Sequence, residues 1–158
     1  MEEIRALGGE DEARRCAEMM CATEPWITIG RDFDESLALV RDPTREVYVA
    51  ADGNQILGFI ILNLRGAFIG YIQTICVEER ARGRGVGTRL VEFAERRIFA
   101  VSPNVFLCVS SFNPRARALY EHLGYELVGE LKDYLIEGAS ELLMRKTIGP
   151  IRGRRRIT

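Results

Sequence analysis

Histidine is almost absent from this 158-residue sequence, and its cysteines show no metal-binding spacing. His122 is the single histidine, and the four cysteines, Cys16, Cys21, Cys76 and Cys108, contain no CxxC pair. Zinc sites are built largely from these two residue types at short spacings. We therefore expect no metal.

Lysine is also scarce. Only Lys132 and Lys146 occur, and the other basic residues are arginines. Acidic and basic side chains nearly cancel, to a formal net charge of −1 at pH 7. A general nucleic-acid-binding domain normally has a clear basic excess, so this balance argues against one. The exception is IRGRRRIT after Pro150. We expect residues 150–158 to be a disordered, solvated basic tail, with contact to RNA or an acidic partner as the alternative.

No apolar run is long enough to cross a bilayer, and no basic-then-apolar signal segment is evident. We accordingly expect a cytoplasmic protein whose thiols are free and mostly buried. The chain is 47% hydrophobic, enough for the core of one domain. We expect that domain to cover residues 1–149.

The first half of the sequence predicts a strand and two helices, followed by three strands in series. EEIRAL is predicted as a strand, residues 10–21 as a helix, EPWITIG as a break and residues 35–40 as a second helix. Asp52-Gly53 is a hairpin signal between two apolar runs, and AFIGYIQTICV is predicted as one long strand ending at Val77. Consecutive strands of this kind favour an antiparallel meander.

In the second half the apolar spacing becomes helical from Val86, and Ser102-Pro103 ends that helix. NVFLCVS is predicted as a buried strand, and Asn113 as the N-cap of a helix that Gly124 ends. Two further strands flank Glu137-Gly138. The sequence therefore predicts an α/β (α+β) fold with a mixed, mainly antiparallel sheet of about seven strands and about four helices.

A glycine-rich turn, Arg82-Gly83-Arg84-Gly85-Val86-Gly87-Thr88, stands between the predicted third strand and the helix after it. Such a turn presents backbone N–H groups and the positive end of a helix dipole to an anion. The phosphate loop GxxxxGK[ST] does not fit, since no lysine precedes Thr88. The dinucleotide fingerprint GxGxxG does not fit either, because Thr88 stands where its last glycine belongs.

The turn does fit the pattern Arg/Gln-x-x-Gly-x-Gly/Ala. ICV (residues 75–77) precedes it, and Asn113, Ala118-Leu119-Tyr120 and Gly124-Tyr125 follow one helix and one strand later. With these motifs the chain, from EEIRAL to about Lys146, resembles the GCN5-related N-acetyltransferase (GNAT) superfamily. The resemblance implies the GNAT fold and an acyltransferase that uses acetyl-CoA as co-substrate. The turn would bind the pyrophosphate, and the strand end would pair with the pantetheine arm.

The resemblance also implies residue roles. Tyr120 would donate a proton to the CoA thiolate, although its place on an apolar helix face equally suits a core residue. The residues expected to bind acetyl-CoA are Ile75, Cys76, Val77, Arg82, Gly83, Arg84, Gly85, Val86, Gly87, Thr88, Asn113, Ala116 and Tyr120.

The acceptor site is expected in the EPWITIG break, because the region between the first two helices forms one wall of the acceptor cleft in the superfamily. Trp26 and Ile27 would line that wall, and Glu24 is a candidate general base. A plug in the core is the alternative role for Trp26. Gln73, acting through an ordered water, and Tyr134 complete the expected substrate-binding set.

Within the superfamily the chain looks most like the ribosomal-protein alanine N-acetyltransferases. That branch reads Leu-Glu-Val-Arg on the strand before the tyrosine-bearing helix, and its glutamate is the base. Here the same stretch is Leu107-Cys108-Val109-Ser110, so the role does not transfer. Burial in a strand raises a thiol pKa, so we expect Cys108 to be structural rather than nucleophilic.

These observations predict acetyl transfer to a primary amine by direct attack in a ternary complex. The amine would belong to a peptide or protein N-terminus or to a small molecule. An α-amine of pKa about 8 suits a weakly basic site better than a lysine of pKa about 10.4. A catalytically weak CoA-binding module is the alternative. Assembly as a homodimer, which many family members form through their last strands, stays open.

Overall fold

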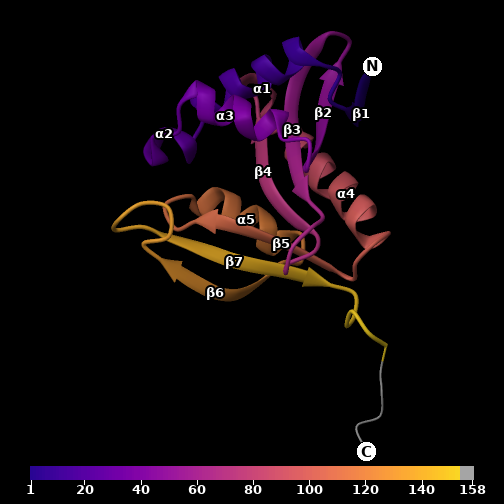
Figure 1. The fold of residues 1–158 in the computed structure, drawn as a ribbon, viewed down its shortest axis with the longest axis vertical. Helices are drawn as coiled ribbons and strands as arrows, with labels where there is room; N and C mark the ends of the chain where they lie inside the picture. Colours follow the sequence, from indigo (N-terminus) through magenta and orange to yellow (C-terminus); the bar gives the residue numbers. More distant parts are fainter. Residues whose placement is uncertain (154–158) are drawn as a thin grey trace, which may run out of the picture. The chain divides into compact units, whose positions relative to one another are not determined.

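The computed structural model describes residues 1–153, and its strands and helices divide into two compact units (Figure 1). The first unit is Met1–Asn63 with Ile72–Ala94, and the second is Leu64–Tyr71 with the chain from Glu95 onward. The two units are interleaved along the sequence, so no linker separates them. Residues 154–158, part of the predicted tail, lie outside the described residues.

The first unit contains four strands in spatial order β1-β2-β3-β4. Antiparallel pairs join β1 to β2 and β2 to β3. The strands are β1 (Glu2–Ala6), β2 (Glu46–Asp52), β3 (Gln55–Asn63) and β4 (Tyr71–Val77). The helices are α1 (Glu10–Cys21), α2 (Trp26–Ile29), α3 (Phe33–Arg41), the 3-10 turn η1 (Glu79–Ala81) and the first part of α4 (Val86–Phe99), whose residues from Glu95 on belong to the second unit.

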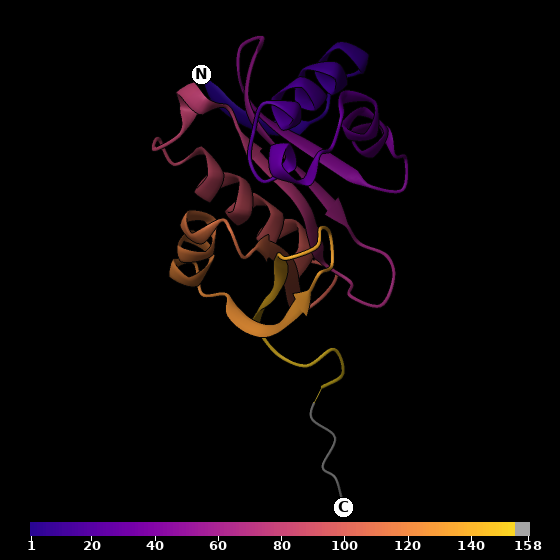
Figure 2. The ribbon, with the colours of Figure 1, turned by 90° about the vertical axis from the view of Figure 1, so that its left-hand side faces the viewer.

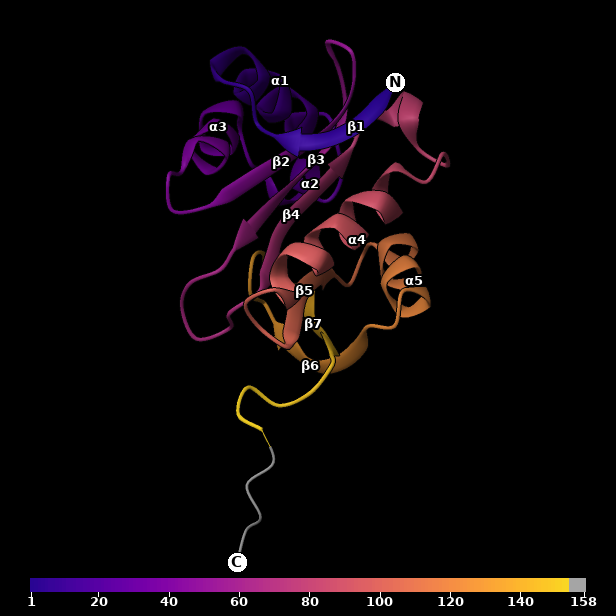
Figure 3. The same cartoon turned by 90° about the vertical axis from the view of Figure 1, so that its right-hand side faces the viewer.

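Helices cover both faces of these strands. On one face α1 and α3 lie side by side (Figure 2, Figure 3), and Met20 and Leu37 pack there with Phe59 and Ile61 of β3. The capping box of Asp32 and Glu35 starts α3 at its first turn. On the other face α4 approaches Gly58 so closely that a Cβ there would lie 3.2 Å from Leu90 Cδ1. The absence of a side chain at Gly58 therefore lets α4 pack closely against β3.

The second unit contains β5 (Asn104–Ser110), α5 (Pro114–His122), β6 (Glu126–Lys132) and β7 (Ser140–Thr147). Strand β7 is central and pairs antiparallel with β5 and β6. The predicted caps of α5 are confirmed. Asn113 Oδ1 accepts from Ala116 N at 3.2 Å, and Gly124 has φ 95° just beyond the helix. Glu95 accepts from Lys146 Nζ at 2.7 Å and from the Tyr125 hydroxyl at 3.4 Å.

The predicted fold class is confirmed. Residues 1–153 hold seven strands, mainly antiparallel, and five α-helices, of which four are longer than a single turn. Two predicted boundaries were wrong. EPWITIG is not a plain break but contains the short helix α2, and the third strand of the meander begins at Tyr71 rather than Ala67. Gly70 explains the second error, because its φ of 97° interrupts the extended backbone. No helix in this part of the chain is long and apolar enough to cross a membrane.

Candidate active site

The glycine-rich turn joins β4 to α4 and presents bare main chain. Residues 82–85 are exposed, and Gly83 and Gly85 have φ values of 76° and 80°. Those values lie in the left-handed region, which side chains with a Cβ rarely adopt. Gly87 differs, because it already belongs to the first turn of α4. The alternate glycines therefore serve two purposes: two shape the turn and the third opens the helix.

The N-terminus of α4 offers free backbone donors. Arg89 N donates to Gly85 O at 3.0 Å, which is the first bond of the helical ladder. The N–H groups of Val86, Gly87 and Thr88 precede that bond and have no acceptor within the helix. The first turn carries no acidic side chain. Aligned donors, a positive dipole end and no competing carboxylate fit a phosphate or pyrophosphate group.

Two arginines hold the turn in shape through their side chains. Arg82 Nε donates to the carbonyl oxygen of Val77 at 3.3 Å, and Arg89 Nη1 donates to that of Arg84 at 3.0 Å. Arg89 also forms an ion pair with Glu2 of β1. Arg84 is exposed. The turn is therefore supported from both ends, and the guanidinium of Arg84 remains accessible to an anion.

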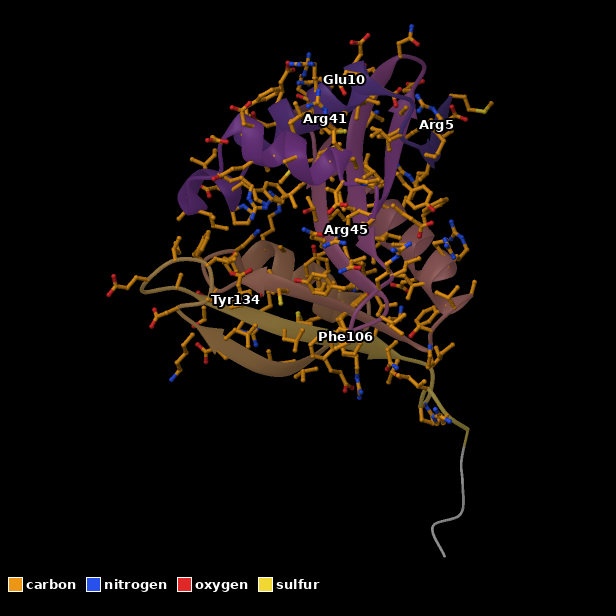
Figure 4. All side chains as sticks on the ribbon, in the orientation of Figure 1. Arg5, Glu10, Arg41, Arg45, Phe106 and Tyr134 are labelled. Atoms are coloured by element: carbon orange, nitrogen blue, oxygen red, sulfur yellow. The ribbon has the colours of Figure 1, made fainter. Side chains whose placement is uncertain are left out.

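Side chains along strand β4 alternate strictly between half-buried and buried. This alternation decides whether each predicted residue can contact a ligand with its side chain or only with its backbone. Gln73, Ile75 and Val77 are half-buried on one face, whereas Cys76 points into the core and is 2% exposed. Burial raises the pKa of Cys76 to about 12. Cys76 can thus reach a ligand only through its backbone. The Gln73 side chain already accepts from Arg45 Nε at 2.8 Å (Arg45 is labelled in Figure 4), which leaves its amide N–H groups as donors.

Tyr120, the predicted acid, is a buried residue of α5. It is 6% exposed, and its ring lies 6.0 Å from that of Tyr125, edge on. Burial raises the pKa of the Tyr120 phenol, and no charged neighbour in the described chain contributes to that rise. Asn113 uses its carbonyl oxygen as the N-cap, so its amide nitrogen is the group left for a ligand.

Comparison with known proteins agrees with this geometry. A family model described as the acetyltransferase (GNAT) family matches residues 12–125. N-alpha-acetyltransferase RimI of Mycobacterium tuberculosis is 31% identical over 146 residues, covering 87% of this chain and 88% of that protein. The chain belongs to the GNAT family of acetyltransferases. The predicted membership in the GNAT superfamily is confirmed, and the similarity to RimI agrees with the predicted likeness to the ribosomal-protein alanine N-acetyltransferases.

Solved GNAT structures share the fold. An aminoglycoside 6'-N-acetyltransferase complexed with coenzyme A has a TM-score of 0.75 at 21% identity, with 94% of this chain and 98% of that chain covered. Arabidopsis thaliana NAA60 in complex with a bisubstrate analogue has a TM-score of 0.76 at 17% identity, with 93% and 98% covered. The chain is thus an N-acetyltransferase that acts on amines, with acetyl-CoA as its co-substrate. Residues 1–153 contain no cluster of side chains suited to a metal ion.

The predicted acceptor residues of the EPWITIG segment fall into different environments. Trp26 is 8% exposed within the core of the first unit, which favours its alternative role as a core plug. Ile27, in contrast, is 53% exposed. Glu24 is exposed, and its Oε2 accepts from Thr28 N at 3.1 Å. The Glu24 carboxylate is thus already engaged in supporting α2, which weakens its case as the base.

The structure surrounds Cys108 with titratable side chains in the second unit. Tyr71 and Glu141 both influence the pKa of Cys108, and Tyr134 and Glu141 both influence that of Tyr71. Burial raises the pKa of the Cys108 thiol, and Tyr71 partly opposes that rise. The thiol is therefore neutral near pH 7, neither base nor nucleophile. Tyr134 lies on the loop joining β6 to β7 (Figure 4) and is 62% exposed.

Neither Tyr71 nor Glu141 was predicted from the sequence, and of the two only Glu141 carries a carboxylate. It is 7% exposed near the start of β7, and burial raises the pKa of its carboxyl group. The sequence carried a signal, since a glutamate directly preceded the apolar run LLM. Without the strand register, however, the face of the sheet on which the Glu141 side chain lies could not be assigned.

Proposed function

We propose that this GNAT enzyme transfers the acetyl group of acetyl-CoA to an α-amine of a peptide or protein N-terminus, or to a small-molecule amine of similarly low pKa. The amine attacks the thioester directly in a ternary complex. The N–C bond forms, the C–S bond breaks and the CoA thiolate leaves. The observation that carries the proposal is the turn after β4, whose bare amides and left-handed glycines suit a pyrophosphate.

The chain's own residues hold the donor. The amides of Val86, Gly87 and Thr88 bind phosphate oxygens, with the Arg84 guanidinium as an added positive charge. The backbone of Ile75 to Val77 pairs with the pantetheine arm, and the Val77 N–H polarises the thioester carbonyl. Asn113 contributes its free amide nitrogen, and Ala116 lies in the first turn of the same helix.

Tyr120 stabilises the leaving thiolate. A phenol ordinarily has a pKa of about 10 and a thiol of about 8.5. Burial raises the phenol's pKa further, so the proton stays on Tyr120 for most of the reaction. The hydroxyl therefore works chiefly as a hydrogen-bond donor to the developing negative charge. In a dry environment such a charge-assisted bond is stronger than a neutral one.

The preference for an α-amine follows from proton chemistry. An amine of pKa about 8 is roughly a tenth unprotonated at neutral pH, whereas a lysine of pKa about 10.4 is almost wholly charged. The neutral Cys108 thiol supplies no strong base at its position. Cytoplasmic peptides and small amines are the acceptors we expect, because we place the enzyme in the cytoplasm.

The test is CoA release from acetyl-CoA with a panel of amino-terminal peptides, amino acids, polyamines and aminoglycosides. Tyr120→Phe should lower kcat by about tenfold to a hundredfold while the affinity for acetyl-CoA stays unchanged. Tyr48→Phe is the matched control, since its hydroxyl donates to Glu46 on β2, outside the proposed site. Tight binding of acetyl-CoA without thiol release for any amine would instead identify a CoA-binding module.

A further inference from the structure

Glu141 and Ser110 face each other across neighbouring strands, and Cys108 lies beside them. The register pairs Ser110 with Glu141 and Cys108 with Leu143. Side chains two residues apart on a strand share a face, so Cys108, Ser110 and Glu141 project to the same side. Directly opposite side chains have Cβ atoms about 5 Å apart, and diagonal neighbours about 7–8 Å. The carboxylate of Glu141 is thus diagonal to Cys108.

The carboxylate is buried without a counter-ion. Glu141 is 7% exposed and makes no ion pair with any described residue. The groups that face it are the Ser110 hydroxyl, the Cys108 thiol, the Tyr71 phenol and, from β6, the apolar Leu131. Tyr134 adds a second phenol from the loop. None of these neighbours is a cation. An unpaired buried carboxylate destabilises a fold, so packing does not explain its presence.

A second observation concerns Ser110. Ser110 is 2% exposed, and its Oγ is a buried atom without a hydrogen-bond partner in the described chain. The hydroxyl lies close enough to the Glu141 carboxylate to oppose the rise in its pKa, yet the pair does not meet the geometry of a normal hydrogen bond. Buried hydroxyls are almost always hydrogen-bonded in native proteins. An unsatisfied hydroxyl next to an unpaired carboxylate suits a ligand that carries several N–H groups, such as a primary amine.

We propose that Glu141 is the proton acceptor for the attacking amine. The inference rests on the acetyl transfer proposed above and names the base of the same reaction. As the amine nitrogen bonds to the thioester carbon, it becomes positively charged and far more acidic. The Glu141 carboxylate takes one of its protons, the C–S bond then breaks, and the proton on Glu141 passes to solvent. Ser110 Oγ accepts the second N–H and orients the nitrogen.

The chemistry favours this carboxylate over its neighbours. A general base works best when its pKa is moved toward the working pH, and burial moves that of Glu141 in this direction. The same burial raises the pKa of the Tyr71 phenol and of the Cys108 thiol, which keeps both protonated. Among Glu141, Cys108 and Tyr71, only Glu141 is a carboxylic acid, the one of these three groups whose ordinary pKa lies below neutral pH and whose conjugate base can therefore receive a proton.

The experiment compares wild-type enzyme with Glu141→Gln, using the best amine from the panel. We expect kcat/KM for the amine to fall by about a hundredfold or more, with the dissociation constant of acetyl-CoA unchanged. Glu126→Gln is the control, since Glu126 is an exposed β6 residue outside this cluster. Between about pH 6 and about pH 9, the Gln variant should regain activity more steeply than wild type, because hydroxide and free amine replace the lost base.

The outcomes separate the two proposals. Wild-type enzyme that turns over no amine contradicts the proposed function itself. Wild-type turnover with a fully active Glu141→Gln variant contradicts the assignment of Glu141 alone. Equal pH profiles for a slow Gln variant and wild type would also overturn it, since a merely structural residue lowers the rate without changing the profile. Partial activity of Glu141→Asp, with the wild-type profile retained, supports the assignment.

Discussion

Arg82 Nε donates a hydrogen bond to the carbonyl oxygen of Val77 at 3.3 Å, so the turn after β4 is tied to the strand that precedes it. The two residues belong to the two parts of the expected acetyl-CoA site, the strand end and the pyrophosphate turn. Because Arg82 precedes the two left-handed glycines, its side chain fixes the point where the chain leaves β4. The Arg82 side chain thereby couples the geometry of the glycine-rich turn to the end of strand β4.

The first prediction follows from this coupling. Arg82→Ala should weaken the binding of acetyl-CoA by about threefold to tenfold, since one hydrogen bond contributes about 0.5–1.5 kcal/mol. Isothermal titration with CoA measures the effect. Arg80→Ala is the matched control, because the Arg80 side chain is 78% exposed and pairs with Glu78 at 3.9 Å. If both variants bind CoA equally well, the Arg82 contact does not shape the site.

The second prediction concerns the middle of the turn. Gly85→Asp should abolish CoA binding, because it places a carboxylate on the path expected for the pyrophosphate and forces a Cβ into a backbone with φ 80°. The new Cβ would also lie 3.0 Å from Arg89 Nη1. Gly53→Asp serves as the control, since Gly53 also has a positive φ but turns the β2–β3 hairpin with open space around it. Normal CoA binding by Gly85→Asp would contradict the pyrophosphate assignment.

Local chemistry made much of this protein predictable from sequence. Asn113, Pro114 and Gly124 marked the ends of α5 because caps act through neighbouring backbone groups. NVFLCVS was correctly predicted as the strand β5, because Pro103 directly precedes this short apolar run and marks its start. The alternate glycines were likewise recognised, and two of them have the left-handed φ that the turn requires.

Features that depend on tertiary contact were not predictable. Trp26 stood in a segment without periodicity, so only the packed core shows that it is buried. Glu141 was missed because its side depends on a strand register that no local pattern fixes. The start of β4 was placed too early, since the bend at Gly70 responds to groups distant in sequence.

The third prediction tests that bend. A Cβ at Gly70 would lie 2.4 Å from Asn104 O and 2.6 Å from Ile98 Cγ2. Gly70→Ala should therefore lower the free energy of unfolding by about 2–5 kcal/mol, from steric overlap added to backbone strain. Gly66→Ala isolates the strain alone, because Gly66 has φ 88° and nothing within 4 Å of a Cβ. That control should cost about 1–2 kcal/mol. Urea unfolding measures both, and equal losses would rule out the steric contribution.

The fourth prediction concerns the effect of Glu141 on the free energy of unfolding rather than on the reaction rate. Burial raises the carboxyl pKa in the folded state, so folded protein holds this proton more tightly than unfolded protein does. Stability from this group is therefore present at low pH. It is lost as pH rises from the ordinary glutamate pKa of about 4.3 through the raised value.

Glutamine keeps the shape without the charge. Glu141→Gln should consequently be more stable than wild type at about pH 8, and the difference should disappear below about pH 4. Urea midpoints across this range measure it, with Glu126→Gln as the exposed control. A Gln variant that is less stable at the higher pH would mean that the carboxylate supports the fold. A variant that gains stability while losing activity is what a base held in an unfavourable environment requires.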